Sequence, residues 1–199
     1  GDVNDLLEGA DLLTVLKALP DTEADCKNMT EAEKIVLAVL ASDGVGEAYR
    51  KLAWFALGRS DETMAIDLLR KGMESGDKKS KKYYALAVLH SENMPDNCPE
   101  AERLLLEIIE ETGDREACSG LGFAYYFSDN LPLDMKKGWE YLLLSCQPLL
   151  PDFPNGNEYV KLFVARTILE DVDSSEAEDL MMYQYLTEVV KNTNETEYR

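Results

Sequence analysis

Two short patterns of small and apolar residues alternate along most of the chain, and their spacing limits the possible folds more than any single motif. The first pattern places a small residue, an apolar residue four positions later, a small residue directly after it, and an apolar residue three positions further on. It occurs at Ala48, Leu52, Ala53 and Ala56, at Ser80, Tyr84, Ala85 and Val88, at Ala117, Leu121, Gly122 and Tyr125, and more loosely at Val160, Val164, Ala165 and Ile168. Spacings of three and four residues are those of one face of an α-helix.

The second pattern also has helical spacing, and each copy follows a copy of the first. Its members are Ala65, Leu69 and Gly72, then Ala101, Leu105 and Ile108, then Gly138, Leu142 and Ser145, then Ala177, Met181 and Gln184. One copy of each pattern makes a unit. The distance along the chain from Ala53, Ala85, Gly122 or Ala165 to the start of the second pattern is the same in the first and fourth units, and the same in the second and third. The length of the unit, in contrast, increases along the chain. Helices that keep their register while loops vary predict an all-α fold of stacked helical hairpins, each covering the apolar face of its neighbour.

Three segments resemble the tetratricopeptide-like repeats, and specifically their Sel-one-like branch. They are the AxxxLGxxY motif at 117–125, DMKKGWEYLLLS at 134–145 and MAIDLLRKG at 64–72. The resemblance covers about residues 46–191 and implies a right-handed α-solenoid of stacked antiparallel helical hairpins. We accordingly expect an N-terminal helical pair or cap packed on the same stack, about four repeats and a short polar tail, with the boundaries 1–45, 46–78, 79–114, 115–156 and 157–191.

Capping signals mark several of the expected helix ends. Thr30 with Glu33, and Ser175 with Glu178, fit the capping box, in which the hydroxyl accepts a backbone N–H and the acid reaches back to the cap. The SGD sequence at 75–77 and the TGD sequence at 112–114 fit the end of one helix and the start of the next. There the glycine can adopt the left-handed conformation and the aspartate can cap the following helix.

The segment GLGFA at 120–124 has the form GxGxxA, a relaxed dinucleotide-binding fingerprint. A phosphate-binding loop of this kind needs a preceding strand and a helix that starts at the glycines. Here the preceding segment has helical spacing, and Gly113 and Asp114 place the helix start well upstream. We therefore expect Gly122 to lie in mid-helix, where a neighbouring helix packs closely, and we expect no cofactor.

Composition narrows the classes of partner. The chain has 199 residues, 39 acidic and 20 basic, and a formal net charge of −19. This charge repels nucleic-acid phosphates and anionic lipid, so we expect neither nucleic acid nor membrane as a partner. It serves solubility, or else attracts a basic protein. No apolar run approaches the roughly 18 residues of a membrane helix.

The cysteines have wide spacing and include no CxxC pair, which argues against a metal site. Cys26, Cys98, Cys118 and Cys146 have mostly small or apolar neighbours, which favours buried free thiols and a reducing, cytoplasmic location. Two disulfides in a processed secreted or periplasmic form stay open as the alternative.

The resemblance implies a concave groove lined by the first helix of each hairpin, at the third, seventh and tenth positions of the first pattern. The predicted partner-binding residues are Arg50, Trp54, Leu57, Lys82, Leu86, Leu89, Ser119, Phe123, Tyr126 and Arg166. Aromatic and arginine side chains are typical of interface hot spots, so this set predicts the docking of a peptide with apolar and acidic residues. In the alternative interpretation, Trp54, Leu89 and Phe123 fill gaps between repeats.

Other segments give weaker signals. KKSKK at 78–82 is a basic cluster. It is typical of the solvated start of a helix, and the alternative is a contact with phosphate or with an acidic peptide. The acidic segment at 170–179 lacks the glycine and terminal glutamate of an EF-hand loop. His90 is the single histidine and has no nucleophile motif beside it.

We expect a protein–protein interaction module and not an enzyme, with no catalytic, cofactor or metal site. The alternatives are a self-associating scaffold, as a homodimer or an extended stack, through exposed residues such as Tyr183 and Tyr185, and a helical-solenoid enzyme, for which an acid/base constellation is missing. The interaction module itself is compatible with a monomer or a homodimer.

Overall fold

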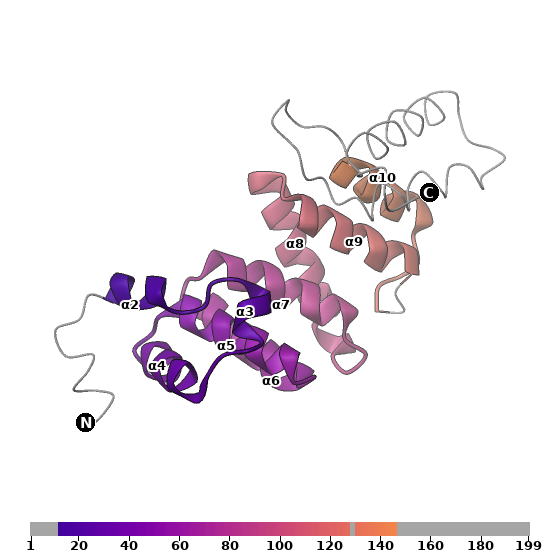
Figure 1. Ribbon diagram of the computed structural model, residues 1–199. Coiled ribbons are helices and arrows are strands. Elements are labelled where there is room, and N and C mark those ends of the chain that lie inside the picture. Colours follow the sequence, from indigo (N-terminus) through magenta and orange to yellow (C-terminus); the bar gives the residue numbers. More distant parts are fainter. Residues whose placement is uncertain (1–11, 128–129, 147–199) are drawn as a thin grey trace, which may run out of the picture. The chain divides into compact units, whose positions relative to one another are not determined.

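The computed structural model describes residues 12–127 and 130–146, and within these ranges every regular element is a helix (Figure 1). The all-α expectation is therefore confirmed for the described residues. The elements are α2 (Leu12–Ala18), α3 (Glu23–Cys26), α4 (Glu31–Ser42), α5 (Gly46–Gly58), α6 (Glu62–Glu74), α7 (Lys78–His90), the 3-10 helix η1 (Pro95–Asn97), α8 (Cys98–Thr112), α9 (Arg115–Phe127) and α10 (Met135–Cys146).

The chain forms two compact units, Gly1–Leu105 and Leu106–Arg199, and the boundary falls within α8. In the first unit α5 packs against α6, α6 against α7, and α5 also touches α7, while α3 and α4 both contact α5. In the second unit α9 and α10 pack against each other. The fourth expected hairpin, at 157–191, lies outside the described residues.

The predicted caps account for where the helices begin. Thr30 and Glu33 form a complete capping box at the start of α4. Asp77 accepts a hydrogen bond from the Ser80 N–H, and Asp114 accepts one from the Ala117 N–H. Gly76 and Gly113 have φ values of +90° and +65°, so each glycine supplies the left-handed turn that ends the preceding helix. Ser175 and Glu178 lie outside the described residues.

The core of the first unit joins its N-terminal helices to α5. The side chains that form it are fully or nearly buried, and they are Leu16, Cys26, Met29, Leu37, Leu40, Ala41, Ala48 and Trp54. Each buried leucine contributes about 2 kcal/mol through removal from water. The small residues Ala53 and Ala85 are both 0% exposed, as expected for positions of close helix contact.

Glycines lie where two helices of the second unit approach most closely. A Cβ atom added to Gly122 in α9 would lie 2.9 Å from the Gly138 carbonyl oxygen and 2.8 Å from Leu142 Cγ. A Cβ added to Gly138 in α10 would lie 2.8 Å from the Gly122 carbonyl oxygen. Because α9 begins upstream at Arg115 and follows another helix, Gly122 is in mid-helix and serves packing, as predicted.

We predict that Gly122→Ala lowers the free energy of unfolding by about 2 kcal/mol, although alanine is the better helix former, because the added methyl group meets backbone atoms that cannot rotate away. Urea denaturation followed by circular dichroism measures this loss. Lys136→Ala, at an exposed position of α10, is the control and should change stability by less than about 0.5 kcal/mol. Equal stability of Gly122→Ala and the wild type would contradict the close-packing interpretation.

Candidate functional site

The first unit contains six of the ten predicted partner-binding residues, on two helices that touch each other. We call this set the α5–α7 strip. It consists of Arg50, Trp54 and Leu57 on α5 and Lys82, Leu86 and Leu89 on α7. On each helix the three positions are separated by four and then three residues, so they share one helix face.

Burial divides the strip into two parts. Arg50, Trp54 and Leu89 are 3%, 6% and 0% exposed. Leu57, Lys82 and Leu86 are only half-buried and keep part of their surface in solvent. The accessible part of the strip therefore combines two leucines with one lysine, and the other three side chains lie within the protein.

An aromatic pair connects α5 to α7 and joins a residue of the strip to one beside it. The rings of Trp54 and Tyr83 meet edge to face, with centroids 5.8 Å apart and an interplanar angle of 74°. The Arg50 guanidinium lies 4.9 Å from the Trp54 ring, and the Lys82 ammonium lies 5.1 Å from the Tyr83 ring. Edge-to-face pairs and cation–π contacts each contribute about 1 kcal/mol. These contacts fix the strip in one arrangement.

Tyr83 is a residue that the sequence patterns did not select. It is half-buried and lies one position after Lys82, outside the columns that the repeat resemblance assigns to the groove. Its aromatic character was the available signal, but only the packing of α7 on α5 shows that it meets Trp54.

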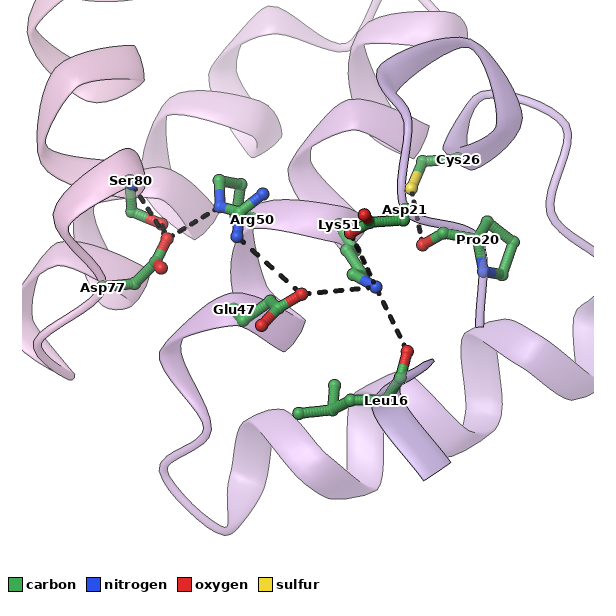
Figure 2. A network of polar contacts seen from close by, with 9 residues as sticks. All are labelled: Leu16, Pro20, Asp21, Cys26, Glu47, Arg50, Lys51, Asp77 and Ser80. Atoms are coloured by element: carbon green, nitrogen blue, oxygen red, sulfur yellow. Dashed lines mark hydrogen bonds and ion pairs between the residues drawn. The ribbon is translucent and has the colours of Figure 1, made fainter. Parts of the chain in front are cut away.

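A carboxylate joins α5 to the start of α7 (Figure 2). The Arg50 Nε–H donates to Asp77 Oδ2 at 2.8 Å, and the same oxygen accepts the Ser80 hydroxyl at 2.6 Å and the Ser80 N–H at 2.9 Å. Burial by itself would raise the pKa of Asp77, but the hydrogen bonds from Arg50 and Ser80 outweigh burial and lower the pKa below its ordinary 3.8. Asp77 therefore caps α7 and holds Arg50 at the same time.

A buried lysine, also missed by the sequence patterns, extends this network toward the N-terminus (Figure 2). Lys51 is 1% exposed, and its ammonium lies 3.4 Å from the Leu16 carbonyl oxygen, 3.4 Å from Glu47 Oε1 and 3.5 Å from Asp21 Oδ1. Buried charges in proteins are paired, and these oxygens supply the pairing. Lys51 thus ties α2 and the segment before α3 to α5.

The second unit holds three further predicted partner-binding residues, all on α9. Ser119 is 6% exposed, and its hydroxyl donates to the Glu116 carbonyl at 3.1 Å. Phe123 and Tyr126 are half-buried. Arg166 lies outside the described residues.

Within residues 12–127 and 130–146, no three His, Cys, Asp or Glu side chains are grouped so that they could hold a metal ion. His90 is exposed in the last turn of α7. The basic KKSKK segment forms the first turns of α7, where Lys78 and Lys79 are exposed and Ser80 is buried. The acidic segment at 170–179 lies outside the described ranges.

Among the cysteines whose side chains the structure describes, Cys26, Cys98 and Cys118 are free and buried. Burial raises the pKa of Cys26 and of Cys118 to about 11 and raises that of Cys98 as well. The Cys26 thiol donates to the Pro20 carbonyl at 3.4 Å (Figure 2). These groups are therefore thiols packed in the interior, and not activated nucleophiles.

Searches of protein-family models, of curated proteins and of solved structures found no match to this chain. Among the helices that the structure describes, none combines the length and the apolar character needed to cross a bilayer.

The Asp77 carboxylate should have a measurable effect on stability. We predict that Asp77→Asn, which retains a capping oxygen but loses the charge, lowers the free energy of unfolding at neutral pH by about 1–2 kcal/mol. Because folding lowers the pKa of Asp77, its contribution is complete above pH 3.8 and is lost as the pH falls through the folded-state pKa. Urea denaturation as a function of pH measures both effects.

Asp61→Asn is the matched control. Asp61 caps α6 by accepting the Met64 N–H at 3.0 Å, and Asn is an equally good cap, so the loss should be only a few tenths of a kcal/mol. If the two variants lose the same stability, or if the Asp77→Asn difference is unchanged well below pH 3.8, the ion pair with Arg50 does not stabilise the fold.

We also predict slow reaction of the buried thiols with Ellman's reagent. In a Cys146→Ser variant at pH 8, a pKa of about 11 leaves about one thiolate in a thousand at Cys26 and Cys118. Both should react at least about 50-fold more slowly in the native protein than in urea, because burial also blocks access. Rapid reaction of either thiol in the native state would contradict the described packing.

Proposed function

We propose that this chain is a protein-interaction module that docks a partner segment on the first-helix face of a right-handed α-solenoid of Sel-one-like, tetratricopeptide-like repeats. The single observation that supports this function best is the construction of the α5–α7 strip. Half-buried Leu57, Leu86 and Lys82 lie on two touching helices, which the Trp54–Tyr83 contact and the Arg50–Asp77 ion pair also join.

A surface held in this way suits binding because it is already ordered. Binding is weaker when flexible side chains must be immobilised, because each one contributes about 1 kcal/mol of unfavourable free energy. The Trp54–Tyr83 contact and the Asp77–Arg50 ion pair fix the backbone of α5 and α7 before any partner arrives. Leu57 and Leu86 then offer apolar contact area to a partner side chain.

The expected partner segment carries an apolar residue and an acid. Lys82 supplies the positive charge on the accessible part of the strip; the residue is half-buried, and its ammonium lies 5.1 Å from the centroid of the Tyr83 ring. Arg50 and Trp54 have a different role in this proposal, because burial and the bond to Asp77 engage them inside the protein. They position the strip and do not touch the partner.

A peptide-display selection against the purified protein tests the proposal. We predict that the enriched peptides include a group that combines apolar residues with Asp or Glu, in spite of the net charge of −19, which by itself favours basic peptides. A synthetic peptide of the enriched sequence should bind the Lys82→Glu variant at least about 10-fold more weakly than the wild type.

Lys17→Glu is the matched control, since it makes the same change of charge at an exposed position of α2, outside the strip. It should alter affinity by less than about two-fold at 0.15 M salt, where exposed charges are screened. Enrichment of basic peptides alone, or equal loss of affinity in both variants, would show that the α5–α7 strip is not the docking surface.

A further inference from the structure

The outer side of α6 carries an open depression that shares no residue with the α5–α7 strip. Its volume is about 490 Å³, and one side is completed by the segment between α7 and η1. The residues that line it are Asp61, Thr63, Met64, Ile66, Asp67, Arg70 and Met94.

The floor of the depression is apolar and adaptable. Ile66 is 2% exposed and forms a fixed base, whereas Met64 is 55% exposed and Met94 is half-buried. Much of the apolar surface of Met64 is therefore in contact with water, and removal of such surface from water is favourable. Methionine side chains are flexible and polarizable, and surfaces that accept varied apolar side chains use them frequently.

The exposed charged side chains that line the depression are acidic. Asp61 and Asp67 are both exposed. Asp67 pairs with Lys71 at 2.8 Å, but both side chains are about half-exposed, and an exposed pair of this kind exchanges readily with a competing cation. Arg70, which also lines the depression, is half-buried, and its guanidinium lies 5.7 Å from the centroid of the buried Tyr84 ring.

We propose that this depression is a second docking site, for a partner segment in which an apolar side chain is flanked by lysine or arginine. The apolar side chain enters between Met64 and Met94, and the flanking cation pairs with Asp67 or Asp61. The net charge of −19 raises the rate at which such a basic segment arrives. The site thus selects the opposite charge from the one proposed for the α5–α7 strip, and neither proposal requires the other.

A synthetic amphipathic peptide of about 15 residues, made of leucine and lysine at helical spacing, is the probe. With the methionine methyl groups labelled with ¹³C and assigned by substitution, the peptide should shift the Met64 and Met94 resonances in 0.15 M salt. Met135 is 50% exposed on α10 and reports non-specific apolar contact, so its resonance should stay in place. A peptide with glutamate in place of lysine should shift none of them.

Two charge variants distinguish docking at the depression from attraction of the peptide by the net charge of the protein. Asp67→Lys should weaken binding of the leucine–lysine peptide about 10-fold, whereas Glu111→Lys, exposed on α8, makes the same change of net charge and should weaken it less than two-fold. Met64→Ser should weaken binding at least three-fold with an unchanged melting temperature, since the side chain is exposed. Unshifted Met64 and Met94 resonances, or equal weakening by both charge variants, would overturn the proposal.

Discussion

Neighbouring helices in this protein approach so closely that small residues are required at their crossing points, and the other features of the structure depend on this constraint. In the second unit the backbones of α9 and α10 meet at Gly122 and Gly138, where neither position has room for a Cβ atom. In the first unit Gly72 lies against Ser80 and against the Gly46 carbonyl oxygen, which brings α6 to the starts of both α5 and α7. Larger residues there would separate the helices and with them the side chains of the strip.

Close approach also explains why charged side chains are buried. When α5 and α7 lie this near each other, Arg50 reaches Asp77, and the carboxylate that begins α7 can also neutralise the guanidinium. Such an ion pair adds modest stability, because desolvation offsets much of the Coulomb attraction. Its stronger effect is on geometry, since a shift of α7 along α5 would break the pair and leave the buried Arg50 with Glu47, 3.9 Å away, as its remaining acidic neighbour.

The two proposed docking surfaces differ in chemistry although they lie in the same unit. The strip combines leucines with the Lys82 ammonium, whereas the depression on α6 combines methionines with Asp61 and Asp67. An acidic protein with one cationic apolar surface and one anionic apolar surface can hold two segments of opposite charge without competition between them. This is the pattern expected of a scaffold whose partners are distinguished by electrostatics.

The sequence by itself determined the helical content, several helix ends and the contact role of small residues such as Gly122 and Ala53. These features follow from spacing and capping chemistry that act within a few residues, as at Thr30 and Asp77. The groove residues were predicted from equivalent positions in the repeats that the chain resembles. Such positions define one face of a helix, but they do not show which side chains cover that face. Whether Trp54 and Leu89 fill gaps between helices therefore stayed open in the sequence, and the burial of Arg50 had no sequence signal; the neighbouring helices decide all three.

Tertiary structure alone decided which distant residues meet. Arg50 and Asp77, and Lys51 and Leu16, are separated by 27 and 35 positions, and no local pattern encodes either pairing. The Trp54–Tyr83 contact and the depression that unites α6 with Met94 arise in the same way, from side chains on different elements. Local preferences act along one helix, whereas a binding surface depends on how the helices pack against each other.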